Sequence, residues 1–197
     1  MFVFHDSFIK TAFLSKKIVK ETEFEQIRQL RTGVIEFSEL VEKLPEHKFV
    51  IELKAYTDYQ YIIDTVCEKH INKDTIDRFR FISFAIDALK HVKKVNPAIH
   101  CTYISTCIDA PRFEPFATKK HLNLCLQFNI NEISGHWLSF RPAVISLVKA
   151  AGLEVGLGMI NGSIEFNYCL KNSVERIYTD NIAKIVQLIN HKKAERI

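Results

Sequence analysis

The sequence has little of what marks secreted, membrane-spanning or nucleotide-binding proteins. Its five cysteines form no CxxC pair, and their odd number predicts free thiols, mostly buried, in a reducing compartment such as the cytoplasm. No stretch approaches the roughly 20 apolar residues that span a bilayer, and no charged segment followed by an apolar one opens the chain, so we expect no membrane span and no export signal. Only six glycines are present, and none builds a GxGxxG or P-loop motif after a strand, which disfavours a dinucleotide or nucleoside triphosphate fold.

The overall composition is that of a globular domain. In 197 residues, 47% are hydrophobic and 25% are charged, which allows one domain with a sizeable core and at most a small elaboration. The net charge of +4 is modest and owes something to a basic tail at residues 191–196. A basic end after a helix suits the helix dipole and solvent, so we expect no nucleic-acid partner.

Strand-like and helix-like patterns alternate along most of the chain. Strands are predicted over residues 49–54, 78–84, 99–104, 122–130, 153–160 and 175–179, and helices over residues 24–30, 37–44, 58–70, 85–95, 142–151, 163–170 and 182–191. A strand fragment is predicted at residues 2–4 and an irregular stretch at residues 109–115. From residue 49 onward this makes six βα units, which indicates a parallel sheet covered by helices.

Six such units ending in a helix predict an α/β fold, a TIM-type (β/α) barrel of eight units that lacks the first two. An open doubly wound sheet is the second interpretation. In either fold, the functional groups should lie at the carboxyl ends of the strands. The polar residues expected there are Glu52, Lys54, Ser83, Ser105, Asn129, Asn161, Thr179 and Asp180. For Asn161, Thr179 and Asp180 a structural role is favoured, because polar residues at strand ends often cap the following helix, and Asp180 best fits such a cap.

The strand at residues 49–54 carries the most informative pair. Side chains alternate along a strand, so Glu52 and Lys54 share one face while Ile51 and Leu53 share the other. Strands of a parallel sheet covered by helices are normally apolar on both faces, so two charged residues at the end of this strand require an explanation. Either the two residues form an ion pair at the mouth of the strand, or Glu52 is a metal ligand beside a phosphate-binding Lys54.

Several short motifs together resemble one family. Their order along the chain is His5-Asp6, then Ile51-Glu52-Leu53-Lys54, then Ile82-Ser83-Phe84, then Asn161, then Ile177-Tyr178-Thr179-Asp180. This order is similar to that of the glycerophosphodiester phosphodiesterases, which are phospholipase C-like phosphodiesterase barrels. The resemblance implies that residues 1–46 are a remnant of the insertion between barrel strands two and three. Residues 47–197 would then supply barrel units three to eight, and the N-terminal part of the family's barrel would be lacking.

The resemblance also implies a chemistry, the metal-dependent hydrolysis of glycerophosphodiesters to glycerol 3-phosphate and an alcohol. Residue by residue, Glu52 matches a metal carboxylate, Lys54 a residue that binds the substrate phosphate, and His5 a catalytic histidine. The family's cation is commonly Ca²⁺ or Mg²⁺, for which hard oxygen ligands are suited. The family's His-Arg-Gly motif and its Glu-x-Asp strand are absent, so the cation is expected to bind weakly or not at all.

Besides the phosphodiesterase, two alternatives stay open at this point. The chain could be a catalytically inactive, truncated relative that acts as a binding or regulatory module, or a gene fragment. Lys54 could instead form a Schiff base, as in aldolases, although the neighbouring Glu52 stabilises the ammonium form and makes the nitrogen less nucleophilic. Six strands of an eight-stranded barrel leave two open sheet edges, which predicts that the chain alone is poorly soluble, partly molten or a homo-oligomer that pairs through these edges.

Overall fold

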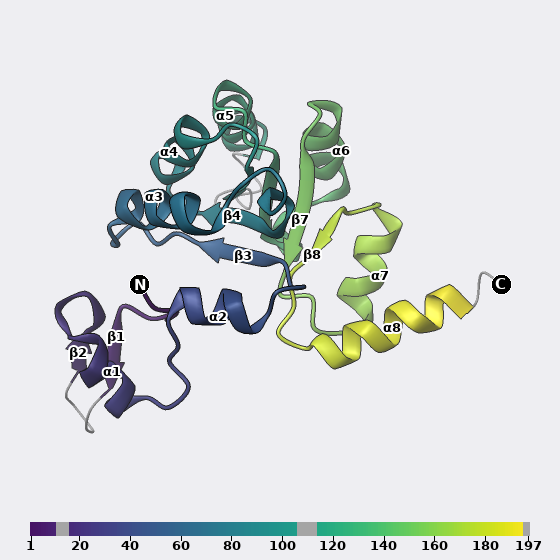
Figure 1. Ribbon diagram of the computed structural model, residues 1–197. Coiled ribbons are helices and arrows are strands. Elements are labelled where there is room, and N and C mark those ends of the chain that lie inside the picture. The colour runs from purple at the N-terminus through teal and green to yellow at the C-terminus, as the bar shows by residue number, and fades with distance from the viewer. Residues whose placement is uncertain (11–15, 106–113, 195–197) are drawn as a thin grey trace.

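A computed structural model describes residues 1–10, 16–105 and 114–194 (Figure 1). Its elements are β1 (Phe8–Lys10), β2 (Lys16–Ile18), η1 (Val19–Glu21), α1 (Phe24–Leu30), α2 (Phe37–Lys43), β3 (Phe49–Glu52), α3 (Tyr59–His70), η2 (Ile76–Arg78), β4 (Phe79–Ser83), α4 (Ile86–Val95), β5 (His100–Ile104), α5 (Glu114–Gln127), β6 (Glu132–His136), η3 (Trp137–Ser139), α6 (Pro142–Ala150), β7 (Glu154–Gly158), α7 (Ser163–Lys171), β8 (Arg176–Ile177) and α8 (Ile182–Ala194). The predicted α/β class is confirmed.

The main sheet has six strands in the order β3-β4-β5-β6-β7-β8, and every neighbouring pair is parallel. The register places Glu52, Ile82, Thr102, Glu132 and Glu154 in one row across five strands. This row starts at the last residue of β3 and ends at the first residues of β6 and β7, a stagger typical of a barrel. The sheet is a curled part of a TIM-type barrel with six strands in the described residues, and Figure 1 shows the helices around its outer side.

The core lies between the outer face of the sheet and the helices. In β4, the buried Phe79 and Phe81 alternate with Arg80, as the period of a strand requires. Phe79 packs against Phe37 of α2 and His70 of α3, with ring centroids 6.5 Å away in each case. The inner face of the sheet is the face that carries Glu52, Glu132 and Glu154, and it is largely polar.

The described residues of the segment 1–46 form an antiparallel pair, β1 and β2, and the short helix α1 at the lower left of Figure 1, followed by α2, which lies below β3. The predicted strand fragment at residues 2–4 is held by a single antiparallel bridge between Phe2 and Glu36. Phe37 of α2 also meets Phe49 of β3, at 6.0 Å between ring centroids. Helix α2 therefore packs directly on the core of the barrel part.

One predicted strand is wrong. Residues 122–130 fall mostly in α5, where Leu122 and Cys125 are buried, three residues apart on one helical face, whereas Leu126 is exposed. Asn129 follows this helix with φ 53° and therefore does not lie at the carboxyl end of a strand. The strand of this unit is β6, which the sequence did not predict. Of the irregular stretch predicted at 109–115, residues 109–113 lie outside the described residues, and α5 begins at Glu114.

The cysteine prediction holds for the described residues. Cys101, Cys125 and Cys169 are buried free thiols and Cys67 is a half-buried one, while Cys107 lies outside the described part. Burial raises the pKa of the Cys101 and Cys125 thiols to about 12, so both are protonated and inert at neutral pH. None of the helices in the described residues has the length and apolar character needed to cross a membrane.

Candidate functional site at the carboxyl edge of the sheet

Glu52 and Lys54 form an ion pair at the carboxyl end of β3. The Lys54 Nζ donates to Glu52 Oε1 at 2.6 Å, and both side chains are about three quarters buried, at 22% and 28% exposure. Leu53, between them, points to the outer face and is buried in the core. The chain then turns, because Thr57 donates both its backbone N–H and its hydroxyl to the Lys54 carbonyl. The prediction that Glu52 and Lys54 share one face is confirmed, and of the two interpretations left open the structure shows the ion pair.

The two serines expected at this edge serve the scaffold instead. Ser83 is buried; its hydroxyl donates to the Leu53 carbonyl at 2.6 Å and accepts from the Ala85 N–H at 3.0 Å. Ser105 is also buried, and its hydroxyl lies 2.7 Å from Nδ1 of His121 on α5. Neither hydroxyl is available to a ligand beside Lys54.

His5 lies close to the same edge through its backbone. Its carbonyl accepts a hydrogen bond of 3.4 Å from the Tyr56 hydroxyl, and Tyr56 follows Lys54 by two residues. The imidazole itself is exposed and bonds to Asp6, at 2.8 Å between Nδ1 and Oδ1. The structure therefore brings the N-terminal segment to the β3 end of the site, with the His5 side chain directed at Asp6.

At the carboxyl ends of β7 and β8, on the side of the sheet away from β3, Asn161 connects the two loops that follow these strands. Its Oδ1 accepts from the Thr179 hydroxyl and from the Asp180 N–H, both at 3.0 Å. The N-cap of α8 is Asn181, whose Oδ1 accepts from the Lys184 N–H at 3.3 Å, so the prediction of Asp180 as that cap is wrong. These residues tie the loops after β7 and β8 together.

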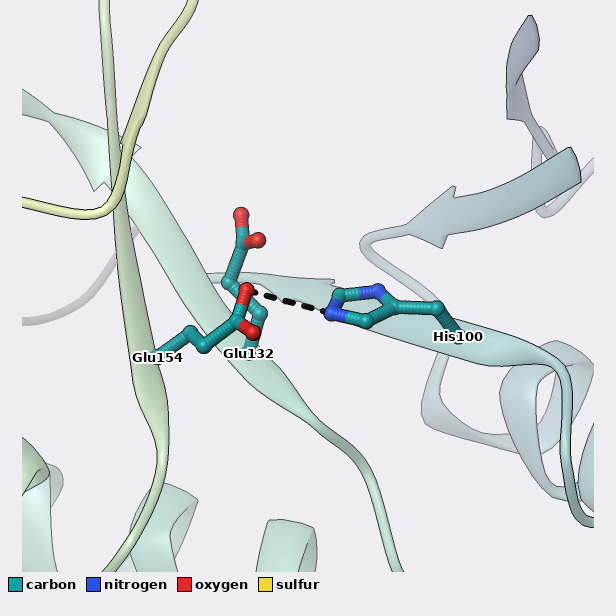
Figure 2. A group of neighbouring side chains, drawn as sticks. All are labelled: His100, Glu132 and Glu154. Atoms are coloured by element: carbon teal, nitrogen blue, oxygen red, sulfur yellow. Dashed lines mark hydrogen bonds and ion pairs between the residues drawn. The ribbon is translucent and has the colours of Figure 1, made fainter. Parts of the chain in front are cut away.

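A second cluster of charges occupies the inner face at the amino ends of β5 to β8. His100, Glu132, Glu154 and Arg176 are the first residues of these four strands. Figure 2 shows three of these side chains, with His100 Nε2 directed at Glu154, 3.2 Å from its Oε2. Arg176 bridges the two carboxylates, since its Nε donates to Glu132 at 2.6 Å and its Nη2 donates to Glu154 at 2.9 Å.

The protonation states in this cluster follow from burial and charge. Burial, helped by the charge of Arg80, lowers the pKa of His100 to about 4 despite the neighbouring Glu154, so the imidazole is neutral at pH 7. Burial also raises the pKa of Glu132, against the hydrogen bonds that it accepts from Arg176 and Tyr178. For Glu154, burial raises the pKa, but the bonds to Arg176 and His100 prevail and hold it below its usual range.

Neither cluster makes a divalent cation site by itself. The ligand atoms of His100, Glu132 and Glu154 lie within 4.8 Å of one another, close enough to share an ion. However, Arg176 already bonds to both carboxylates, and Arg80 Nη1 is 3.9 Å from Glu154. The two arginines therefore balance the charges of the two glutamates, and a metal ion would have to displace a guanidinium group. At the carboxyl end of β3, Glu52 belongs to no group of three possible metal ligands (histidine, cysteine or carboxylate) among the described residues.

Comparison with known proteins finds the fold but no sequence relative. No family model matches this chain, and no curated protein matches it. Among solved structures, a phosphodiesterase from Oleispira antarctica in complex with its product sn-glycerol-3-phosphate is 20% identical, with a TM-score of 0.77 over 96% of this chain and 79% of the other.

Two further solved structures are glycerophosphodiester phosphodiesterases. The protein from Parabacteroides distasonis is 16% identical, with a TM-score of 0.74 over 98% of this chain and 79% of its own. The protein from Agrobacterium tumefaciens is 17% identical, with a TM-score of 0.67 over 91% of this chain and 78% of its own. The resemblance predicted from the short motifs is therefore confirmed at the level of the fold.

Proposed function

We propose that the carboxyl edge of this sheet binds the phosphoryl group of a glycerophosphodiester, and that the chain acts as a phosphodiesterase that releases glycerol 3-phosphate and an alcohol. The observation that supports this proposal is the Lys54–Glu52 pair, which lies on the inner face at the end of β3. Several solved structures that share the fold are phosphodiesterases, and one of them holds sn-glycerol-3-phosphate. In barrels of this type, the carboxyl ends of the strands carry the active site.

Lys54 is the proposed phosphate-binding residue. An ammonium group has three N–H donors, and only one of them bonds to Glu52. The remaining donors can therefore bond phosphoryl oxygens without breaking the ion pair. Because Glu52 bonds Nζ, it also fixes the direction in which the ammonium points.

His5 is the proposed proton donor to the leaving alkoxide, a step that an imidazole within hydrogen-bond reach can catalyse. The N-terminal segment lies next to the β3 end of the site, where the His5 carbonyl is 3.4 Å from the Tyr56 hydroxyl. In the present arrangement the His5 imidazole bonds to Asp6, so it would have to turn toward the substrate. Catalysis therefore requires the His5 side chain, whereas phosphate binding does not.

Glu52 is the proposed metal ligand, in keeping with the family's use of Ca²⁺ or Mg²⁺. A single carboxylate that is already paired with an ammonium is a poor site for either ion, because both need several oxygen ligands. A cation bound there would offset the charge that builds on the phosphoryl oxygens. The proposed roles of Lys54 and His5 do not depend on that cation.

The test separates binding from turnover. Titration calorimetry with sn-glycerol 3-phosphate should show binding to the wild type and a loss of about 10- to 100-fold in Lys54→Gln, the equivalent of about 1.5–3 kcal/mol for a charged hydrogen bond. Lys90→Gln is the matched control, since Lys90 forms a similar pair with Asp87 at 2.8 Å on the exposed face of α4. Release of glycerol 3-phosphate from glycerophosphocholine measures turnover.

Each outcome has a clear meaning. Binding through Lys54 with no turnover would identify the chain as an inactive relative that acts as a binding module. Equal binding by the wild type and Lys54→Gln would refute the proposal. If borohydride trapped a carbonyl substrate on Lys54, the aldolase alternative would be correct.

We also propose a reducing, cytoplasmic location and self-association. The four cysteines in the described residues are free thiols, and β3 and β8 are the outermost strands of the described main sheet. Free edges offer unpaired backbone groups to another copy. Light scattering should report a mass above that of the monomer, and a monomer that unfolds cooperatively would contradict this expectation.

A further inference from the structure

Two histidines occur in the six described strands of the main sheet, and they lie at opposite ends of its inner face. His100 opens β5 and belongs to the charged cluster at the amino ends of the strands. His136 is the last residue of β6, and it shares the inner face with Glu132 because side chains alternate along a strand. His136 therefore lies at the carboxyl edge of the sheet, as the Lys54–Glu52 pair does.

The stagger of the sheet sets His136 level with Glu52. The register places Glu52 in one row with Glu132, the first residue of β6. In a barrel of the TIM type, however, the level along the barrel axis shifts by about one residue from strand to strand. Because β6 is three strands away from β3, the level of Glu52 lies about three residues beyond Glu132. That level falls on Gly135 and His136, and His136 is the one of these two on the inner face.

Contacts on one side of the ring hold the His136 imidazole. Its Nδ1 accepts a hydrogen bond of 3.3 Å from the Leu138 N–H, which makes His136 the N-cap of η3. The ring also stacks on the Trp137 indole, with 6.4 Å between ring centroids, and Trp137 meets Tyr168 of α7 at 5.8 Å. A backbone N–H can only donate, so the proton of the neutral ring is on Nε2. This Nε2–H has no hydrogen-bond partner among the described residues.

The space beside His136 is open on the side of β7. His136 is exposed, and its register neighbour on β7 is Gly158, which has no side chain. A Cβ placed on Gly158 would lie 3.7 Å from the Gly135 carbonyl oxygen and from Tyr178 Cβ, which is an ordinary van der Waals distance. A ligand at the carboxyl edge can therefore reach the Nε2–H of His136 from this side.

Lys54 and His136 would approach such a ligand from different sides. The strands β4 and β5 separate them in the curled sheet, so a ligand that reaches both residues must offer two different groups. The ammonium of Lys54 suits an anionic phosphoryl group. A neutral N–H donor suits a hydroxyl oxygen, and the glycerol part of a glycerophosphodiester carries two hydroxyl groups.

We propose that His136 is a specificity-determining residue of this site, whose Nε2–H donates to a hydroxyl oxygen of the glycerol part of the substrate. This inference rests on the proposed function for the phosphoryl group at Lys54. It adds a contact that distinguishes a glycerophosphodiester from a simple alkyl phosphodiester, because a site that bonds a substrate hydroxyl disfavours the analogue that lacks it.

Titration calorimetry of the full chain with two ligands tests this contact. The ligands sn-glycerol 3-phosphate and n-propyl phosphate share the phosphate and the three-carbon chain, but only the first carries hydroxyl groups. The wild type should bind sn-glycerol 3-phosphate about 3- to 10-fold more tightly than n-propyl phosphate, the range that one neutral hydrogen bond gives. His136→Asn should lose most of this preference, and His136→Gln should keep it.

These two variants separate a ligand contact from a merely structural cap. The Asn amide can still accept from the Leu138 N–H as an N-cap, but it does not reach the position of Nε2. The Gln amide places an N–H donor there and gives up the cap. A ligand preference that survives in His136→Asn would overturn the inference. Leu138→Ala is the control, since it keeps the backbone N–H and should leave the preference unchanged, and circular dichroism checks that each variant folds.

The same titrations keep the two proposals apart. Lys54→Gln should weaken the binding of both ligands alike, whereas His136→Asn should weaken only that of sn-glycerol 3-phosphate. A wild type that binds both ligands equally through Lys54 would overturn this inference and leave the proposed function intact. Equal losses of both ligands in His136→Asn would place His136 at the phosphoryl group, which also overturns the inference. A wild type that binds neither ligand would overturn both proposals.

Discussion

Replacing His100 by glutamine should remove an acid-dependent loss of stability. His100 is the first residue of β5, and its imidazole is 18% exposed on the inner face of the sheet. It faces Arg80 on β4, Glu132 on β6, Glu154 on β7 and Arg176 on β8. Two guanidinium groups and burial together oppose a positive charge on this ring more strongly than Glu154 favours it.

The size of the effect follows from the pKa. The pKa of His100 falls from 6.5 to about 4 on folding, and at about 1.36 kcal/mol per pKa unit the difference corresponds to about 3 kcal/mol. Because the folded pKa is the lower one, the unfolded chain binds the proton first. Stability is therefore fully present above about pH 6.5 and falls as the pH drops toward 4.

Urea unfolding of the wild type and of His100→Gln between pH 7 and pH 4 measures this effect. The free energy of unfolding of the wild type, minus that of the variant, should fall by about 3 kcal/mol over this range. The prediction compares the free energies of unfolding of the wild type and the variant at each pH, because Glu132 adds a pH dependence of its own. Its raised pKa stabilises the fold as the pH falls, which is opposite to the effect of His100. His47→Gln, at an exposed histidine, serves as the control. A wild-type minus His100→Gln difference that stays flat from pH 7 to pH 4 would refute the placement of His100 beside Arg80 and Arg176.

Three further predictions concern the same inner face and the metal. Arg176→Met should lower the free energy of unfolding by about 3–5 kcal/mol, because it leaves Glu132 buried without its cation. In the double variant Glu132→Gln/Arg176→Met, thermal denaturation should show much of this loss restored; if the two effects simply add, the pair is not coupled. Gly156→Ala should cost about 1–3 kcal/mol, since the new Cβ would meet Tyr178 Cε2 at 2.8 Å and also the Glu132 carboxylate, and an unchanged melting temperature would contradict this packing. A chelator should leave glycerol 3-phosphate binding unchanged in calorimetry, because Lys54 and not a cation is the proposed binding group; a tenfold loss would show that a metal site is present.

The misplaced strand shows where a sequence pattern becomes ambiguous. Residues 122–130 alternate apolar and polar side chains, which predicts a strand, yet the same segment also offers Leu122 and Cys125 at helical spacing. The true strand, β6, has Glu132, Ser134 and His136 on its inner face and only Ile133 and Gly135 on the other. It does not read as an apolar run because this sheet has a polar inner face, contrary to the usual rule for parallel sheets.

The sequence alone determined the α/β class, five of the six strands in the main sheet, most of the helices and the position of Glu52 and Lys54 on one face of a strand. These depend on local periodicity and on side-chain alternation along a single strand. Only the tertiary structure decided that His100, Glu132, Glu154 and Arg176 meet, because they lie on four strands and come together through the stagger of the sheet. The sequence predicts which side chains a strand presents, and the curl of the sheet decides which strands share a site.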